Sequence, residues 1–486
     1  MRKSLSFIFL VVSLFSGNFL SAQNDFREKY DKFREESRKN YDSFRDECNR
    51  KYVEFLKSAW DWYEGKAPIP VPVEQTPVPP RPYDEKKQPA PIETTPVDVK
   101  PVAPEPQPKP VEPVKEVPTP KDDYFSFDFY GLNSKVRLPD AAKLRLKDCS
   151  NTSIADGWER LCVDEMNNAI RDCLEARIRY NLCDWAYLRF LDELSRQYCA
   201  DANGATLLMA FLYCQSGYQM RLAVDGGKLC MLYGSKHQIF DKGYFVVDGI
   251  SFYAYNEPSN SISICAAAFE GETPMSLLVG SEQKLGGVLS DNRVIGSKRY
   301  PEVTAGSSVP TNLIDFYNSY PTSAIDGNPM TRWAMYANTP LAAATRDRLY
   351  PALRKSLEGK STLQQAEMLL NWVQTGFVYE YDEKVWGGDR AFFAEESLYY
   401  PYCDCEDRSI LFSRLVRDLL GLDVALIYYP GHLATAVCFG DDTKGDAMMI
   451  GGKKFTVCDP TYIGAPVGAQ MPGLEYDKTQ AIVLSR

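Results

Sequence analysis

The chain has 486 residues, and its 55 Lys and Arg are outnumbered by 65 Asp and Glu. An acidic chain is poorly suited to bind the phosphate backbone of nucleic acids, so a nucleic-acid partner is excluded. The 13 Cys are an odd number, so an exported chain cannot pair all of them internally. The two His, His237 and His432, are the only positions for imidazole chemistry near neutral pH.

Residues 1–22 have the features of a secretory signal peptide. The basic start MRK precedes a mostly apolar run over residues 5–15 and the small-residue exit LSA. This run is too short to span a bilayer, and no later stretch reaches roughly 18 continuous apolar residues, so we expect no membrane span. No Cys lies near the expected cleavage site before Gln23, which argues against a lipid anchor. The mature protein is therefore expected to be exported, as a periplasmic or secreted protein.

Residues 23–66 repeat an aromatic pattern every 11 residues. The repeated positions are Tyr30, Tyr41, Tyr52 and Tyr63, and then Phe33, Phe44 and Phe55. Eleven residues make three helical turns of about 3.67 residues each, so the pattern predicts one amphipathic helix with an aromatic stripe. Acids and bases interleave elsewhere, as on a solvated face. We expect the stripe to self-associate as a coiled coil or to dock on the same chain, and not to lie on a membrane, because the polar face is not predominantly basic.

More than half of the chain's 32 Pro lie in the next segment, residues 67–122. Proline lacks the N–H group that helices and sheets require, so this composition predicts a disordered, polyproline-like linker that buries no core. A docking ligand for a Pro-binding domain is the alternative interpretation. The rest of the chain is long enough for two domains, which we expect at residues 123–300 and 301–486.

The clearest chemical pattern lies near the C-terminus. Cys405 stands in DCEDRSILF and begins a stretch, residues 405–420, whose apolar positions recur at helical spacing before Gly421. Cys405 is therefore expected in the first turn of a buried helix. Unpaired N–H groups and the positive end of the helix dipole there favour a thiolate, the form of sulfur that attacks carbonyl carbon.

Two further groups follow Cys405 along the chain. His432 comes after a Pro-Gly turn and begins an apolar strand that runs to residue 439, and a second strand, residues 454–458, ends before Asp459. Antiparallel pairing of these strands would place Asp459 beside His432, where a carboxylate orients the imidazole. The chain thus offers a nucleophile, a base and an orienting acid in the order Cys405, His432 and Asp459.

These motifs resemble the transglutaminase-like superfamily over residues 361–468, and are most similar to exported bacterial members that carry DCEDRS and DPTY. The resemblance implies an α+β fold with a papain-like core, in which a helix bearing the Cys packs on an antiparallel sheet. It implies Cys405 as nucleophile, His432 as base and Asp459 as orienting acid. The implied reactions are acyl transfer from glutamine amides, deamidation or peptide-bond hydrolysis, acting on a protein or peptide substrate.

An earlier stretch faintly repeats this region at a spacing of 204 residues. Tyr-Cys, an apolar helix-like run, Gly and a strand follow one another from Tyr198 and again from Tyr402. In the ungapped register Cys405 falls opposite Asp201, His432 opposite Lys228 and Asp459 close to Asn256. A gapped register would instead place His237 at the base position. Because either register lacks the thiol, residues 123–300 are expected to be a degenerate, catalytically silent copy.

Two alternatives use the same residues differently. A structural zinc site would take Cys403, Cys405, His432, Cys438 and Cys458, but their spacing does not fit the usual paired motif, so we expect neither a metal nor a cofactor. The protein would otherwise be a catalytically weak or silent envelope interaction or scaffold protein.

Several neighbouring groups remain to be assigned. The Cys405 N–H is a candidate oxyanion donor, and Trp386 and Tyr400 lie upstream as candidates for a second donor. Glu406 and Asp407 either bind substrate or stabilise the helix start. The odd Cys count is explained most simply by one free thiol, Cys405, with disulfides among the others.

Overall fold

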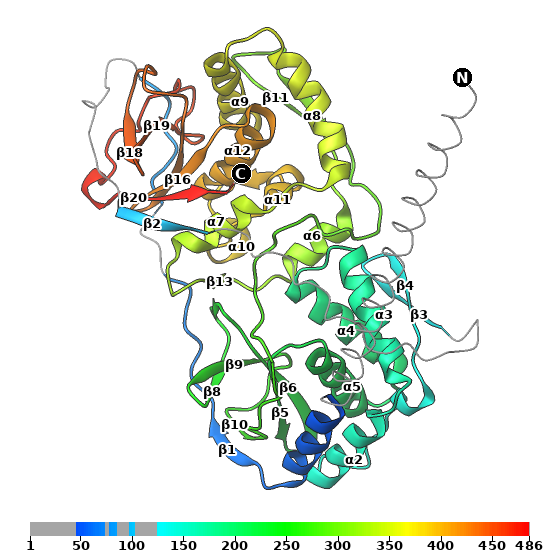
Figure 1. The fold of residues 1–486 in the computed structure, drawn as a ribbon. Coiled ribbons are helices and arrows are strands. Elements are labelled where there is room, and N and C mark those ends of the chain that lie inside the picture. Colours follow the sequence, from blue (N-terminus) through cyan, green and yellow to red (C-terminus); the bar gives the residue numbers. More distant parts are fainter. Residues whose placement is uncertain (1–44, 73–76, 85–96, 103–123, 486) are drawn as a thin grey trace, which may run out of the picture.

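The structure is a computed structural model that describes residues 45–72, 77–84, 97–102 and 124–485 (Figure 1). The expected signal peptide and residues 23–44 of the expected helix lie outside the described residues. Helices and mostly antiparallel sheets both contribute to the structure, which confirms an α+β fold. Within the ranges described, every helix is too short or too polar to cross a bilayer.

Two lobes make up the molecule. Lobe 1 contains a helix over residues 45–57, β1 (Asp61–Glu64), β3 (Phe125–Phe129), β4 (Leu132–Val136), η2 (Asp140–Ala142), α2 (Asn151–Leu161), α3 (Met166–Arg179), α4 (Asp184–Tyr198), α5 (Ala202–Gln215), β5 (Met220–Asp225), β6 (Lys228–Gly234), β7 (Gln238–Ile239), β8 (Tyr244–Val247), β9 (Ile250–Ala254) and β10 (Ser261–Ile264). Lobe 2 contains β2 (Val97–Val102), β11 (Arg293–Gly296), β12 (Thr304–Ser307), α6 (Thr311–Asn318), β13 (Ser323–Ala324), α7 (Met330–Asn338), α8 (Ala343–Leu357), α9 (Thr362–Gly376), β14 (Val378–Tyr379), α10 (Asp382–Trp386), α11 (Ala394–Tyr399), β15 (Tyr402–Cys403), α12 (Cys405–Leu420), β16 (Val424–Tyr429), β17 (His432–Val437), β18 (Ala447–Ile450), β19 (Lys453–Cys458), η3 (Tyr476–Lys478) and β20 (Gln480–Leu484).

The six-stranded sheets of the two lobes share one topology. From edge to edge, the sheet of lobe 1 reads β8-β9-β6-β5-β10-β1 and that of lobe 2 reads β18-β19-β17-β16-β20-β2. In each lobe a buried helix, α5 or α12, leads into a hairpin with a two-residue turn, and a third strand pairs antiparallel with the second hairpin strand. The lobes differ at one edge, since β1 is antiparallel to β10 whereas β2 is parallel to β20. The expected duplication is therefore present as a repeat of topology.

Local sequence explains where the two buried helices begin and end. At the start of α5 the carboxylate of Asp201 accepts a hydrogen bond of 2.7 Å from the N–H of Gly204. At the start of α12 the carboxylate of Asp407 accepts one of 3.2 Å from the N–H of Asp404. Helix α12 ends at Gly421, whose φ of 67° is the left-handed conformation that favours glycine at a helix C-terminus.

Apolar side chains alternate between the two faces of the sheet in lobe 2. Val424 and Leu426 of β16 belong to the main core, which also contains residues of α12 and continues into lobe 1. Ala425 and Ile427 point the other way, into a smaller cluster. Because one core runs through both lobes, the lobes are not separated by a solvated gap.

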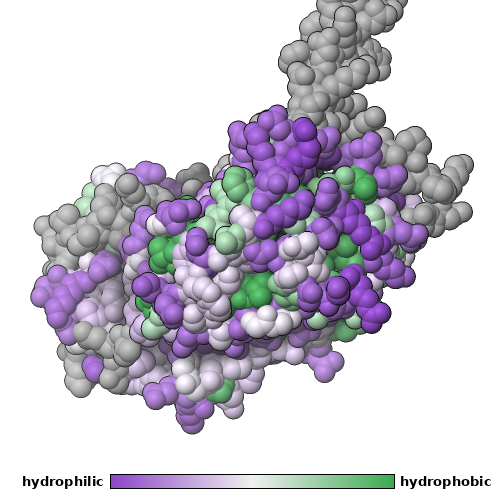
Figure 2. All heavy atoms as spheres, turned by 90° about the horizontal axis from the view of Figure 1, so that it is seen from below, coloured by the Kyte–Doolittle hydropathy of each residue, from purple (hydrophilic) through white to green (hydrophobic). Residues whose placement is uncertain are grey.

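The face seen from below in Figure 1 carries scattered hydrophobic residues among hydrophilic ones (Figure 2).

The helix predicted over residues 23–66 is wrong at its C-terminal end. The helix ends at residue 57, and residues 61–64 form β1, whose hydrogen bonds to β10 extend the sheet of lobe 1. The stripe docks on the same chain where it is described: Tyr52 is 2% exposed and its ring centroid lies 4.8 Å from that of Trp158. Phe55, by contrast, is 50% exposed. Pairing with a sheet edge therefore overrides the helical repeat after residue 57.

This docking gives a prediction for stability. Trp158 is fully buried, packs against the rings of Tyr52 and Phe211, and donates a hydrogen bond of 3.1 Å to Asn49. Trp158→Ala leaves a cavity between the helix and lobe 1, so we expect the free energy of unfolding to fall by about 3–5 kcal/mol in a denaturant titration. Trp62→Ala, at a side chain that is 73% exposed, is the matched control and should change it by less than about 0.5 kcal/mol. Equal losses in both variants would contradict this packing.

The predicted linker, residues 67–122, is not free of the folded lobes where it is described. The N–H of Val78 donates to the carbonyl of Gly431 at 2.9 Å, and that of Tyr83 donates to Ile463 at 2.9 Å. Residues 97–102 form β2, which adds an edge strand to the sheet of lobe 2. The expectation of a disordered linker is therefore wrong for these parts, because an extended chain can still use its remaining N–H groups to pair with an exposed sheet edge.

The expected domain boundary at residues 300 and 301 is also wrong. It cuts the hairpin of β11 and β12, in which Arg293 pairs with Ser307 and Gly296 pairs with Thr304. This hairpin belongs to lobe 2, because Trp372 of α9 donates a hydrogen bond of 3.0 Å to the carbonyl of Ile295. The boundary therefore lies before residue 293.

Candidate active site

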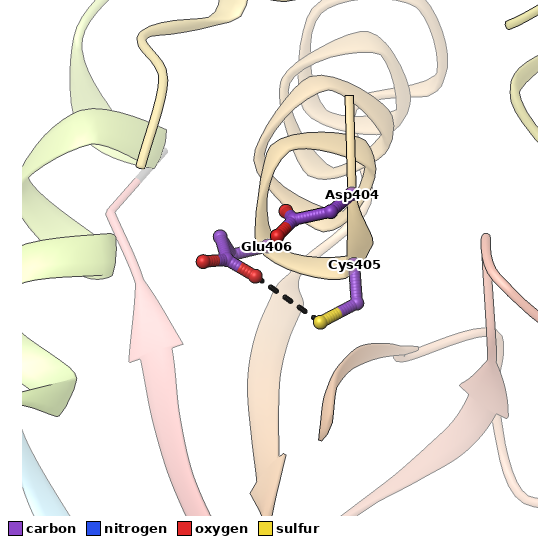
Figure 3. Close-up of side chains that lie close together, drawn as sticks. All are labelled: Asp404, Cys405 and Glu406. Carbon is purple, nitrogen blue, oxygen red and sulfur yellow. Dashed lines mark hydrogen bonds between the residues drawn. The ribbon is translucent and has the colours of Figure 1, made fainter. Parts of the chain in front are cut away.

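Cys405 is the first residue of α12, and its side chain is 4% exposed. Its thiol donates a hydrogen bond of 3.1 Å to Oε2 of Glu406, drawn as the dashed line in Figure 3. The backbone N–H of Leu433 also donates to the sulfur. Since Leu433 directly follows His432, the sulfur of Cys405 lies against the start of β17.

His432 and Asp459 form a buried pair on neighbouring strands. Strands β17 and β19 pair antiparallel, as expected, and Nε2 of His432 lies 2.9 Å from Oδ2 of Asp459. The second carboxylate oxygen, Oδ1, accepts hydrogen bonds from the N–H groups of Thr461, at 2.8 Å, and Tyr462, at 3.2 Å. This arrangement fixes the carboxylate, and the carboxylate fixes the imidazole.

The other imidazole nitrogen, Nδ1 of His432, is buried and has no hydrogen-bond partner. No hydrogen bond joins it to the thiol of Cys405, which donates to Glu406 instead. Helix α12 packs on the strand that carries His432, since Oγ of Ser409 donates to the carbonyl of Leu433 at 3.0 Å. The structure thus brings His432 and Asp459 into contact and places Cys405 at the adjoining strand end, with its thiol turned to Glu406.

The expectation of a stabilised thiolate is wrong for this arrangement. Burial raises the pKa of the Cys405 thiol, and the carboxylates of Glu406 and Asp404 raise it further. A helix N-terminus contributes only about 0.3–1 kcal/mol in favour of an anion. Burial and two acidic neighbours outweigh it, so the thiol is protonated at neutral pH.

Five carboxylates surround the start of α12, and we call them the acidic cluster: Asp382, Asp389, Asp404, Glu406 and Asp407. Burial raises the pKa of Asp382, Asp404, Glu406 and Asp407, and repulsion from their acidic neighbours adds to the effect. Asp389 is paired with Arg332 at 2.5 Å. Asp407 accepts from the N–H groups of Asp404 and Phe392, so it caps the helix, whereas Glu406 faces the thiol.

A cleft of about 970 Å³ leads to Cys405. Its lining includes four members of the acidic cluster, all but Asp407, together with the loop at Gly387 and Gly388 and with Gly431, which precedes His432. Pro70, Pro72 and Pro77 of the predicted linker also line it. The cleft is therefore large enough for a peptide-sized ligand and strongly acidic where it meets the thiol.

The proposed second oxyanion donors belong to a separate aromatic cluster. The rings of Trp386 and Tyr400 pack with centroids 4.9 Å apart, and the guanidinium of Arg390 lies over both rings. The hydroxyl of Tyr400 donates to Asn318 at 2.9 Å. Tyr400 is therefore engaged elsewhere, and the N–H groups at the start of α12 remain the candidate oxyanion donors.

Sequence reasoning missed a residue that holds the pair in place. Gln374 of α9 donates to the carbonyls of Asp459, at 3.0 Å, and Ala465, at 3.2 Å, and accepts from the N–H of Gly464 at 3.0 Å. It thus fixes the loop that carries Asp459. Its one sequence signal is a polar side chain within an apolar run, next to Trp372 and Val373.

Lobe 1 has no thiol at the equivalent helix start. Asp201 precedes α5 as Asp404 precedes α12, so the residue equivalent to Cys405 is Ala202, and the predicted match to Asp201 is wrong by one position. The N–H of Leu229, equivalent to that of Leu433, donates to Asn203 at 2.9 Å. The shift arises because the segment from helix to hairpin differs in length between the lobes.

The other predicted matches can also be placed. Lys228 begins β6 as His432 begins β17, which agrees with the ungapped register. Ala254 of β9 pairs with Leu232 as Val457 of β19 pairs with Ala436, so Asn256 is the residue that corresponds to Asp459 in the sheet register, as expected. His237 lies beside the short strand β7, with Nε2 3.5 Å from Oγ of Ser276, so the gapped register is wrong.

All 13 cysteines lie in the described residues, and none is paired in a disulfide. The expectation of disulfides among them, with Cys405 as the exception, is therefore wrong: the odd count does not single out Cys405. Ten of the 13 are buried, where free Cys behaves as a small apolar side chain.

The residues of the zinc alternative do not gather at one point. Among the described residues, the groups of three or more candidate ligands within 4.8 Å of one another include Cys405 but none of Cys403, His432, Cys438 and Cys458.

None of the protein-family models, curated proteins or solved structures compared with this chain matches it.

Proposed function

We propose that the protein is an exported cysteine acyl-transfer enzyme of the transglutaminase-like type, with a papain-like core in lobe 2. The observation that carries this proposal is the buried 2.9 Å contact between His432 and Asp459 beside the helix that begins at Cys405. The unpartnered Nδ1 of His432 and the cleft at Cys405 support it further. The resemblance at DCEDRS and DPTY supplies the class of reaction, and residues 1–22 supply the expected export.

In the proposed reaction, the thiol of Cys405 turns from Glu406 to His432, and Nδ1 takes its proton. The thiolate attacks an amide carbonyl carbon, and the N–H groups at the start of α12 stabilise the resulting oxyanion. The imidazolium returns the proton to the departing amine or ammonia, and a thioester remains on Cys405. Water or a second amine then releases the acyl group, giving hydrolysis or transfer. Asp459 stabilises the imidazolium throughout.

Lobe 1 takes no part in this chemistry, because Ala202 and Lys228 stand where the nucleophile and base would be. We assign it a binding or supporting role. A scaffold protein without activity is the second candidate function, and it is favoured by the resting thiol, which is protonated and bonded to Glu406.

Trapping of an acyl-enzyme tests the proposal. The protein is incubated with peptide and glutamine amides, and separately with an activated ester, and its mass is measured after rapid acid quenching. We expect an acyl adduct on the peptide that contains Cys405, and its loss in Cys405→Ala. Cys403→Ala is the matched control and should keep the adduct, because Cys403 is a buried thiol two residues away that faces the carbonyl of Val378. An adduct that persists in Cys405→Ala, or no adduct with any donor, would favour the scaffold.

A further inference from the structure

The hydroxyl of Tyr379 is a buried hydrogen-bond donor that the proposed reaction does not yet use. Tyr379 is the second residue of β14, and its Oη is buried without a hydrogen-bond partner. A buried hydroxyl that has lost its water and gained no other partner costs about 1–3 kcal/mol. In a native protein such a group calls for an explanation, and a role in catalysis is one of the few that apply.

Strand pairing places this hydroxyl on the side of Cys405. Strand β14 pairs parallel with β15, and Tyr379 lies opposite Cys403. Because Asp404 is extended, Cys403 and Cys405, two residues apart, direct their side chains to the same side of the chain. Burial raises the pKa of the Tyr379 hydroxyl, and of its acidic neighbours Cys405 raises it most. The hydroxyl therefore stays protonated at neutral pH, as a donor must, and lies within electrostatic reach of the sulfur.

Arg408 of the DCEDRS motif holds the ring of Tyr379 in this position. Arg408 lies one helical turn after Cys405 on α12, is 1% exposed, and has its guanidinium carbon 5.3 Å from the ring centroid of Tyr379. Its two terminal nitrogens donate to the carbonyls of Gln374, at 3.2 Å, and Phe377, at 3.0 Å. The end of α9 and the start of β14 are thereby fixed to the helix that bears the nucleophile.

We propose that the hydroxyl of Tyr379 is the second oxyanion donor, with Arg408 as its positioning residue. This inference rests on the proposed function, since an oxyanion forms only if Cys405 attacks a carbonyl. When the thiolate adds to the amide carbon, the electron pair of the C=O π bond moves to the oxygen. The N–H of Cys405 and the O–H of Tyr379 then donate to this oxyanion. The C=O bond forms again as the C–N bond breaks, and Tyr379 keeps its proton throughout.

The absence of a partner at rest distinguishes Tyr379 from the earlier candidate Tyr400. A donor that is free in the resting enzyme and bonded only when charge develops on the substrate lowers the barrier to reaction without tightening substrate binding. The hydroxyl of Tyr400 would first have to break its 2.9 Å hydrogen bond to Asn318. Tyr379 has no such bond to lose.

Tyr379→Phe tests the donor, because it keeps the ring beside Arg408 and removes only the hydroxyl. Acylation of Cys405 by an activated ester, measured by rapid quenching and peptide mass, should slow by about 10²–10³-fold, the usual effect of losing one oxyanion donor. Alkylation of Cys405 by iodoacetamide displaces iodide and forms no oxyanion, so its rate should stay near that of the wild type. The free energy of unfolding should not fall, since the variant removes a buried group that has no partner.

Tyr381→Phe is the matched control, because the ring of Tyr381 packs edge-on against that of Tyr379, with centroids 5.4 Å apart. It removes a hydroxyl from the same aromatic pair, and both of its rates should match those of the wild type. Arg408→Lys keeps the charge but loses the paired donation to two carbonyls. It should slow acylation on its own but add little to Tyr379→Phe, in which the hydroxyl that Arg408 positions is already absent. Equal losses in both backgrounds would give Arg408 a structural role only.

Three outcomes would overturn the role of Tyr379. If Tyr379→Phe is acylated at the wild-type rate, Tyr379 is not a donor, and the proposed function stands without it. If the variant slows alkylation as much as acylation, the hydroxyl acts on the thiol before any oxyanion forms. If the wild type itself forms no acyl-enzyme with any donor, the proposed function fails, and Tyr379 has no oxyanion to bind.

Discussion

Asp459→Asn is expected to slow formation of the acyl-enzyme by about 10³–10⁴-fold while the protein stays folded. Oδ1 of Asp459 accepts two backbone N–H groups, from Thr461 and Tyr462. These donors fix the orientation of the new amide, because its NH₂ group cannot replace Oδ1 beside them. The NH₂ group must therefore take the place of Oδ2 and face Nε2 of His432.

This reversal decides the tautomer of the imidazole. Facing a donor, Nε2 must become an acceptor, so the proton of neutral His432 moves to Nδ1. Nδ1 is the nitrogen assigned to take the proton of Cys405, and once protonated it cannot act as a base. The hydrogen bonds of the side chain are otherwise kept, so we expect the free energy of unfolding to change by less than about 1 kcal/mol.

Rapid-quench measurement of acyl-enzyme formation with an activated ester gives the rate, and a denaturant titration gives the stability. Asp446→Asn is the matched control: Asp446 is a buried carboxylate in the same lobe that accepts the N–H of Gln470 at 2.9 Å without contacting His432. We expect its acylation rate to stay near that of the wild type. An Asp459→Asn variant within tenfold of the wild-type rate would refute the role assigned to Asp459.

Glu406→Gln is expected to accelerate alkylation of Cys405 at neutral pH. Burial is the main cause of the raised pKa of Cys405, and the charge of Glu406 is the next. Removing a negative charge beside an acid that ionises to an anion lowers its pKa. A larger fraction of Cys405 is then thiolate at every pH below that pKa. The profile of alkylation rate against pH therefore moves to lower pH, and below the pKa the rate rises by up to about tenfold for each pH unit by which the pKa falls.

Labelling at Cys405 is measured across pH by peptide mass, with half-buried Cys438 of the same molecule as internal reference. Glu383→Gln is the matched control, since Glu383 lines the same cleft but is not among the groups that raise the pKa of Cys405. Its profile should coincide with that of the wild type. If the Glu406→Gln profile stays in place or moves to higher pH, Glu406 does not hold the thiol protonated.

Much of the candidate site follows from short stretches of sequence. The apolar spacing of residues 405–420 and the stop at Gly421 place Cys405 at a helix start, and the Pro-Gly turn places His432 at a strand start. Asp459 reaches His432 because the next long strand of the same sheet ends there. These features depend on local periodicity and turn chemistry, which a sequence shows directly. The sequence predicts the repeat of helix, hairpin and third strand in lobe 1 for the same reason.

Contacts between distant segments decided the rest. The aromatic repeat predicts a helix through residue 66, but residues 61–64 pair with β10, some 200 residues away. Residues 97–102 pair with β20, although their composition predicts only a linker. Pairing with a sheet edge that is distant in the sequence produces no periodic pattern in the residues of the added strand, so the sequence does not predict it.

The protonation state of Cys405 also shows which properties follow from local sequence and which follow from tertiary structure. The sequence by itself determined which thiol, imidazole and carboxylate belong together, because each stands at the end of an element with its own local signature. Only the tertiary structure decided that the thiol is protonated and turned to Glu406, since this depends mainly on the burial of Cys405 and on how closely the carboxylates of Glu406 and Asp404 approach it. Burial and the distances between charges are properties of the packed chain, and residue order does not contain them.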